Sequence, residues 1–469
     1  MTVAVRIRKK WQALILCLLI CLPAHGSAEG GYFPDYEIFE TESGTAVYIA
    51  PTGEVPLVTL RVIVEAGSVL DPSGMEGLAG LTAGMLMKGA VGLNEDRILE
   101  RLETVGGRLR VEPGRDAVII SGSFLAVDIE TGIDLISRIL LSPEFDPETL
   151  RREKRQAISE IGSRRYYSLA TDIFLEAVLP GGYAHPGQGY RESVERITAD
   201  DLREFYSDYY RPGRTALVVT GRADRAAVTA LAERYFGGWK AEGEPERSEI
   251  RGGRGFDPET EVLIIDQPGI TQSEIRIGGS APSRDTGDYY PLTLGNKILG
   301  RGRTSRLYRE LRERKGLVYS IRSEAGYFRD AGYFGVYTYA VNDRVREVID
   351  GVLSVLNRFE EGAVGEEEIA GARKYLTGAL PFLMETSGDI AKRISDIHLY
   401  GLSPDYFDCF ADSIKAVSPE KVRNSVSEHF LSGRRIIVVL TDYSRTRGQF
   451  SGLGRVEVIS RRRAESGLR

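Results

Sequence analysis

Histidine, the commonest catalytic and zinc-binding side chain, is scarce and scattered in this 469-residue chain. The histidines are His25, His185, His398 and His429. A zinc site on a helix needs two histidines about one turn apart, and catalytic zinc usually takes three protein ligands. No two of these histidines are within helical reach of each other. We therefore expect no catalytic residue, no bound metal and no other cofactor in this chain.

Two side chains in the second half could instead hold a peptide. Arg312 falls in a stretch that is typical of a capped helix ending at Gly316, and Tyr319 follows in the next strand. A guanidinium and a phenol can both donate hydrogen bonds to a peptide carbonyl or to a developing oxyanion. On the residues alone, a solvated helix arginine and a core tyrosine are the simpler interpretation.

Two carboxylates, Glu153 and Glu160, lie two turns apart on one face of a helix expected from about residue 146 to beyond residue 160. The same helix is rich in arginine, so the favoured interpretation is that both are surface acids near basic neighbours. One carboxylate cannot retain zinc by itself.

The stretch from Glu76 to Gly89 predicts a helix with a bare face. Gly80 and Gly84 lie one turn apart on that face, with Ala83 beside them, and each glycine in a helix costs about 1 kcal/mol relative to alanine. Either another segment packs closely there, or functional side chains are missing. The apolar stripe that predicts the helix consists of Leu78, Leu81, Thr82 and Met85.

The composition is that of a globular protein. The chain has 61 basic and 67 acidic residues and a net charge of −6, with no strongly basic block in the folded region, so nucleic acid is an unexpected partner. Residues 1–28 have the basic start, short apolar run and small-residue end of a signal peptide, with cleavage after Ala28. We expect export, to the periplasm in a Gram-negative bacterium, and no membrane span afterwards; an uncleaved anchor is the alternative.

The order of predicted elements restarts after residues 241–259, which are rich in Gly, Glu and Arg and are typical of a solvated linker. Similar segments recur at one offset of 220 residues, from Ile197 to Val417 and from Gly213 to Gly433. A constant offset across a helix, a Gly-Arg turn and a strand indicates a duplicated α+β domain. We assign residues 29–240 and 260–444 to the two copies and expect residues 445–469 to be disordered or a loose edge strand.

This duplication resembles the pitrilysin/insulinase family, in the branch of the mitochondrial processing peptidase and bacterial two-domain zinc peptidases. The motifs that carry the resemblance are Gly67-Ser68, Gly77-Leu78-Ala79, Met85-Leu86-Met87-Lys88-Gly89 and His185-Pro186-Gly187. The resemblance implies two homologous domains, each a mainly antiparallel sheet with helices packed on one face, forming a half-clamshell.

The resemblance also implies roles for the residues above. Enzymes of the family carry His-x-x-Glu-His, in which two histidines bind zinc and the glutamate activates water. Here Gly80 and Gly84 stand at the histidine positions and Ala83 at that of the base, whereas Glu160 matches the third ligand. The substrate-holding pair of the family corresponds to Arg312 and Tyr319.

These features predict a non-catalytic, substrate-binding subunit of a heterodimeric zinc metallopeptidase that acts on peptides. The zinc would lie in a separate paralogue of the same family. The alternative is a peptide-binding or scaffold protein with no enzymatic partner.

Overall fold

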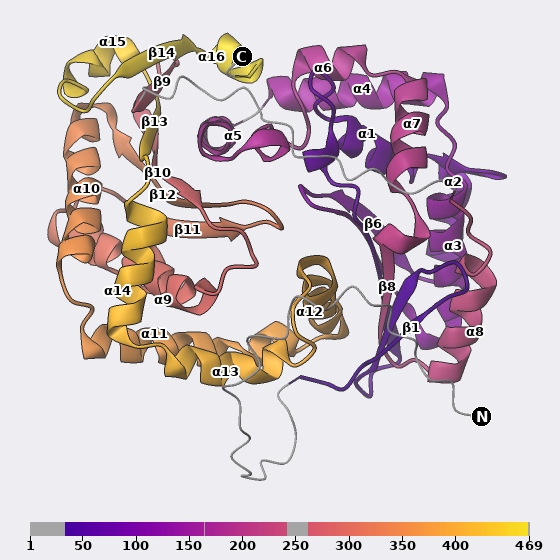
Figure 1. Cartoon of the computed structure of the whole chain (residues 1–469). Coiled ribbons are helices and arrows are strands. Elements are labelled where there is room, and N and C mark those ends of the chain that lie inside the picture. Colours follow the sequence, from indigo (N-terminus) through magenta and orange to yellow (C-terminus); the bar gives the residue numbers. More distant parts are fainter. Residues whose placement is uncertain (1–32, 164, 242–260, 468–469) are drawn as a thin grey trace.

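The computed structural model describes residues 33–163, 165–241 and 261–467. The predicted signal peptide lies outside these ranges, and so does the predicted linker except for its first residue. Within the described ranges, the chain forms two halves that face each other, each built on a six-stranded sheet (Figure 1).

The first sheet has the strand order β1-β2-β8-β3-β7-β6. Its pairs are antiparallel except for β2 with β8. The strands are β1 (Glu37–Glu40), β2 (Ala46–Pro51), β3 (Leu57–Val64), β6 (Arg108–Pro113), β7 (Val118–Leu125) and β8 (Thr215–Gly221). A separate two-stranded pair joins β4 (Gly89–Ala90) to β5 (Leu93–Asn94).

The second sheet repeats this order as β14-β9-β13-β10-β12-β11. Its pairs are antiparallel except for β9 with β13 and with β14. The predicted class, a two-domain α+β fold with mainly antiparallel sheets, is therefore confirmed. The strands are β9 (Val262–Asp266), β10 (Gln272–Ala281), β11 (Ile321–Tyr327), β12 (Gly332–Val341), β13 (Ile436–Thr441) and β14 (Val456–Ser460).

One face of each sheet packs on helices of its own half, where the two largest apolar cores form. The helices of the first half are α1 (Leu78–Met85), α2 (Glu95–Thr104), α3 (Ile129–Leu141), α4 (Pro147–Gly162), α5 (Tyr166–Val178), α6 (Arg191–Arg196), α7 (Ala199–Tyr209) and α8 (Arg225–Phe236). Those of the second half are α9 (Tyr289–Gly300), η5 (Tyr308–Arg314), α10 (Val345–Glu361), α11 (Glu366–Ala379), η7 (Pro381–Met384), α12 (Ser387–Tyr400), α13 (Tyr406–Ala416), α14 (Pro419–Val426), η8 (Ser427–Leu431), α15 (Tyr443–Thr446) and α16 (Arg461–Glu465).

The other face of each sheet carries a helix from the opposite half. Helix α5 packs on β10 and β13 of the second sheet, and α12 packs on β3 and β8 of the first (Figure 1). Because each exchanged helix buries apolar side chains against the partner sheet, the two halves share two interfaces. Sequence periodicity cannot show that helices cross over in this way.

The predicted repeat is visible at its helix caps. Thr198 accepts a hydrogen bond from the backbone N–H of Asp201 at the start of α7, and Ser418 accepts one from Lys421 at the start of α14. Side-chain oxygens at these positions satisfy backbone donors that the first helical turn leaves unpaired. Strands β8 and β13 follow these helices and lie in equivalent places in the two sheets.

The C-terminal segment, expected to be disordered or a loose edge strand, contains an ordered edge strand. Residues 456–460 form β14, which pairs in parallel with β9, and α16 follows it. Ile459 and Ala464 are buried in a cluster that includes apolar side chains of α5. Residues 456–460 are therefore ordered because they pair with the edge of β9 and pack against helix α5. The second domain accordingly extends well past residue 444.

Candidate functional site

The bare face of α1 is filled at one end and open at the other. A Cβ atom on Gly80 would lie 2.9 Å from the carbonyl oxygen of Gly187, closer than side-chain carbons approach, whereas a Cβ on Gly84 would meet nothing within 4 Å. The neighbour of Gly80 is the loop 185–189. Between the two glycines, Ala83 is fully buried in the first core. The face is therefore a close-packing surface at Gly80 and an exposed surface at Gly84.

The loop 185–189 is fixed by contacts that leave His185 buried. The guanidinium of Arg115 donates to the carbonyl oxygen of His185 at 2.9 Å, and Nδ1 of His185 donates to the carbonyl of Pro186 at 3.0 Å. Burial lowers the pKa of His185, which favours the neutral ring. The geometry agrees with a structural loop histidine.

The start of α1 is held by a buried aspartate. Both carboxylate oxygens of Asp71 accept backbone hydrogen bonds, from Gly77 and Ala79, each at 2.7 Å. Burial of the carboxyl raises the pKa of Asp71 to about 8, against the lowering effect of those two bonds. Gly77 itself has a φ of 100°, a conformation that glycine adopts easily.

The two glutamates of α4 lie in different surroundings. Glu153 is half-buried and pairs with Lys88 at 3.2 Å, and Lys88 also contacts Glu95 at 2.9 Å. Glu160 is exposed and accepts a hydrogen bond from Gln156 at 3.0 Å. This arrangement supports the interpretation of both as surface acids, since an ion pair and a local hydrogen bond account for them.

The structure brings the predicted substrate-binding pair together. The Cζ atom of Arg312 lies 4.8 Å from the ring centroid of Tyr319 and 4.9 Å from that of Tyr308, so its guanidinium lies against two tyrosines. Tyr319 is 73% exposed, which makes it a surface residue and not the core tyrosine of the simpler interpretation. The sequence suggested the pair but not the second tyrosine.

The helix that carries Arg312 leaves its donors available. Within this segment, Glu310 pairs with Arg314 at 2.9 Å, with Lys315 at 3.2 Å and with Arg358 at 3.6 Å. Within the described residues, Arg312 makes ring contacts but no ion pair or hydrogen bond through its guanidinium. The segment Tyr308–Arg314 is a π-helix, a form that is frequent at functional positions.

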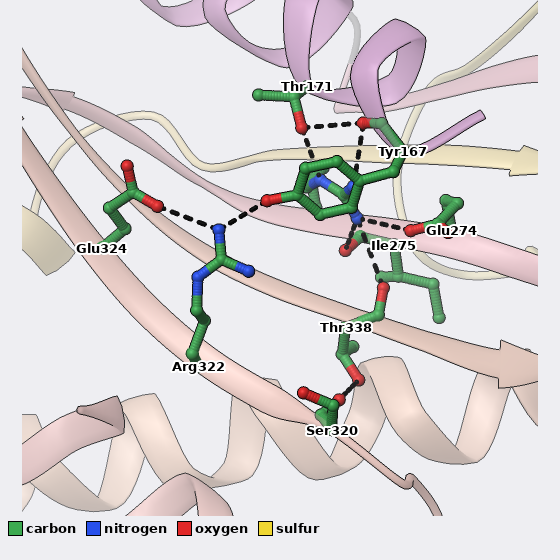
Figure 2. A network of polar contacts seen from close by, with 9 residues as sticks. Tyr167, Thr171, Glu274, Ile275, Ser320, Arg322, Glu324 and Thr338 are labelled. Atoms are coloured by element: carbon green, nitrogen blue, oxygen red, sulfur yellow. Dashed lines mark hydrogen bonds and ion pairs between the residues drawn. The ribbon is translucent and has the colours of Figure 1, made fainter. Parts of the chain in front are cut away.

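A second arginine cluster, missed by the sequence analysis, joins α5 to the second sheet. Arg276 on β10 has no exposed surface and donates to Thr171 at 3.2 Å, to the Tyr167 carbonyl at 3.1 Å and to Glu274 at 3.1 Å. Figure 2 shows Arg322 of β11 between Glu324 and the hydroxyl of Tyr167. An arginine between two isoleucines, Ile275 and Ile277, was the available signal, because a buried arginine requires partners.

The comparisons with known proteins agree with this architecture. A sequence profile described as "Insulinase (Peptidase family M16)" matches residues 47–179, and one described as "Peptidase M16 inactive domain" matches residues 196–376. An uncharacterized zinc protease of Mycobacterium leprae is 26% identical over 397 residues, 82% of this chain and 87% of that protein. One from Bacillus subtilis is 21% identical over 403 residues, covering 84% and 95%.

Two solved structures share the fold. A peptidase M16 inactive domain from Pseudomonas fluorescens has a TM-score of 0.79 at 24% identity, covering 87% of this chain and 97% of that one. A protease from Helicobacter pylori has a TM-score of 0.81 at 17% identity, covering 87% and 100%.

The fold and the two family profiles, which match successive parts of the chain, together identify a two-domain protein of the metallopeptidase class. The chain belongs to the pitrilysin/insulinase family, peptidase family M16. None of the described helices combines the length and apolar character needed to cross a bilayer.

The residues on α1 do not fit a zinc site. Gly80, Ala83 and Gly84 offer no ligand atom, and Glu160 offers a single carboxylate, whereas zinc sites use three or four protein ligands. Among the described residues, the group with suitable ligand spacing is Asp288, Glu428 and His429. There the Asp288 carboxylate already contacts Lys421 at 2.5 Å and His429 at 3.1 Å. The positive charge that balances this carboxylate is therefore the Lys421 ammonium group, and no metal ion is needed for that purpose.

Proposed function

We propose that this chain is a non-catalytic, substrate-binding subunit of a zinc metallopeptidase that acts on peptides. The partner is a paralogue of the same family that carries His-x-x-Glu-His and the zinc. Gly80, Ala83 and Gly84 are then a metal site that has lost its ligands and its base. This chain contributes part of the peptide-binding wall.

The observation that carries this proposal is the contact between the half-buried Arg312 and the exposed Tyr319. Two tyrosine rings orient the guanidinium without using its N–H donors, which keeps those donors free for a carbonyl group of a bound peptide. Glu310, two residues before Arg312, is engaged by Arg314 and Lys315 and not by Arg312.

The proposal includes export of the protein. Residues 1–28 direct the chain out of the cytoplasm, to the periplasm in a Gram-negative host, and are removed after Ala28. Sequencing the N-terminus of protein recovered from the periplasmic fraction tests this part, with Glu29 expected as the first residue.

Co-expression with a zinc-bearing paralogue tests the partnership. The two chains are expected to co-purify in equal amounts and to hydrolyse unfolded peptides together, whereas this chain alone is inactive. Recovery of only homodimers, or only of unrelated proteins, would contradict the heterodimer and favour the alternative of a peptide-binding scaffold.

A further inference from the structure

A cavity of about 390 Å³ opens in the second half, away from the α1 face. It lies among α9, α11, η7, α12 and α13, which supply most of its lining. Helices α9 and α11 hold the places in their half that α1 and α4 hold in the first, judged by the order of elements. Its size falls in the range of about 300–1,000 Å³ typical of small-molecule sites.

The charged groups that line the cavity are mostly basic. The lining contains the basic side chains Arg284, Arg301 and Arg393 and the acidic side chain Asp396, so two positive charges are uncompensated when all four groups are ionised. Arg393 pairs with Asp396 at 2.9 Å. Arg301 is exposed and has no ion pair within the described residues, and Arg284 lies 3.6 Å from the ring centroid of Tyr289. An anion would therefore be attracted to this cavity.

Three buried polar atoms of the lining residues have no hydrogen-bond partner among the described residues. They are the hydroxyls of Tyr327 and Tyr406 and Nε of Arg393. Buried polar groups in native proteins are almost always hydrogen-bonded, so these are polar groups in the lining that the described protein itself leaves unsatisfied.

The rest of the wall is apolar. Leu376, Ala379 and Leu380 of α11 and its C-terminal end face Phe407 and Phe410 of α13 across the cavity. Leu383, which is 40% exposed, lies at the rim next to Phe382, which is 72% exposed. Exposed apolar side chains at an opening favour entry of a ligand with an apolar body.

We propose that this cavity binds a small organic acid, one carboxylate group on an aryl or alkyl body. The carboxylate pairs with Arg284 and Arg301 and accepts hydrogen bonds from the cavity wall, and the apolar body lies between α11 and α13. Such a ligand satisfies both the excess positive charge and the apolar lining, which neither a neutral lipid nor an inorganic anion does.

Calorimetric titration of the full mature chain with 4-phenylbutyrate and with its neutral amide tests the proposal. The acid is expected to bind with one-to-one stoichiometry and at least about tenfold more tightly than the amide, since only the acid forms charge-assisted hydrogen bonds. Equal affinity of acid and amide, or no saturable binding of either 4-phenylbutyrate or octanoate, would overturn it.

Variants locate the site. Arg301→Gln is expected to weaken binding of the acid about tenfold, whereas Arg303→Gln, two residues away, exposed and outside the lining, leaves it unchanged. Ala379→Phe, which fills the cavity, is expected to abolish binding without lowering Tm. Undiminished binding by a folded Ala379→Phe variant would place the ligand elsewhere and contradict the assignment.

One further titration distinguishes a small free acid from the C-terminal carboxylate of a peptide. A short peptide ending in phenylalanine with a free carboxyl group presents similar chemistry. If that peptide binds through Arg301 and the small acids do not, the cavity is a peptide-end site and the proposal of a small-molecule ligand is wrong.

Discussion

The carbonyl oxygen of Gly187 lies 2.9 Å from the point where a Cβ atom of Gly80 would stand. This single contact divides the bare face of α1 into a packed end and an open end. Both glycines suggested a missing side chain in the sequence, but only Gly84 has room for one without movement of the neighbouring backbone.

Alanine substitutions distinguish the two ends. Gly80→Ala is expected to destabilise the protein by about 1–3 kcal/mol, because the added methyl group forces the loop 185–189 away from α1. Gly84→Ala is expected to stabilise it by up to about 1 kcal/mol, because alanine favours the helix and meets no neighbour. Urea unfolding of the two variants checks this, and shifts of the same sign and size would contradict the packing.

The cluster in Figure 2 predicts unequal roles for two arginines. Arg276→Ala is expected to cost about 2–5 kcal/mol, since it removes a buried group and leaves polar partners between α5 and β10 unpaired. Arg322→Ala is the matched control, exposed and paired with Glu324, and is expected to cost less than about 1 kcal/mol. Equal losses in urea unfolding would show that the interface does not depend on Arg276.

We expect the protein to lose stability in mild acid because of His398. It contacts Tyr48 at 3.1 Å at the interface between the halves, and burial lowers its pKa below the ordinary 6.5, with Glu65 opposing and Arg329 adding to the effect. The unfolded chain therefore takes up the proton first as pH falls. The contribution of His398 is fully present above pH 6.5 and is lost as pH falls through 6.5 toward the lowered folded-state pKa.

His398→Asn keeps a polar partner for Tyr48 and removes the titrating ring. The free energy of unfolding, measured at pH 7 and pH 5, is expected to fall less in this variant than in the parent. His185 is also buried with a lowered pKa, so it too lowers the free energy of unfolding as the pH falls. Because it is present in the variant and in the parent, it does not affect the difference between them. Identical decreases in the two would rule out a contribution from His398.

Metal removal predicts opposite outcomes for the chain and for the complex. The purified chain is expected to contain no stoichiometric zinc and to keep its Tm in a chelator, because α1 offers no ligands. The complex with the paralogue is expected to lose its peptidase activity under the same treatment. One zinc per isolated chain, with chelator-sensitive hydrolysis, would instead make this chain a peptidase with altered metal chemistry.

How far the sequence predicts the molecule depends on the range of the interactions. The stripe of α1 and the caps at Thr198 and Ser418 are local signals, and the structure confirms those elements. The exchange of α5 and α12 could not be predicted, because it depends on contacts between distant segments. The sequence left open whether the C-terminal segment is disordered or an edge strand for the same reason, since Ile459 is buried by partners that include β9 and α5.

The candidate site shows the same limit. The pair of Arg312 and Tyr319 was suggested by the family resemblance, because on the residues alone a solvated arginine and a core tyrosine were the simpler interpretation. Tyr308 was missed although it lies four residues before Arg312, a spacing that brings side chains together on a helix. Gly80 and Gly84 looked alike in the sequence because the loop that separates their roles is about a hundred residues away in the chain.

Steady-state kinetics of the complex with Arg312→Ala test whether this arginine holds the substrate. Arg309→Ala, which changes an exposed arginine on the same helical segment, is the matched control. Arg312→Ala is expected to lower kcat/KM about 10- to 100-fold with an intact complex, and Arg309→Ala to change it less than about twofold. Unchanged peptidase activity in the Arg312→Ala complex would contradict the assigned role.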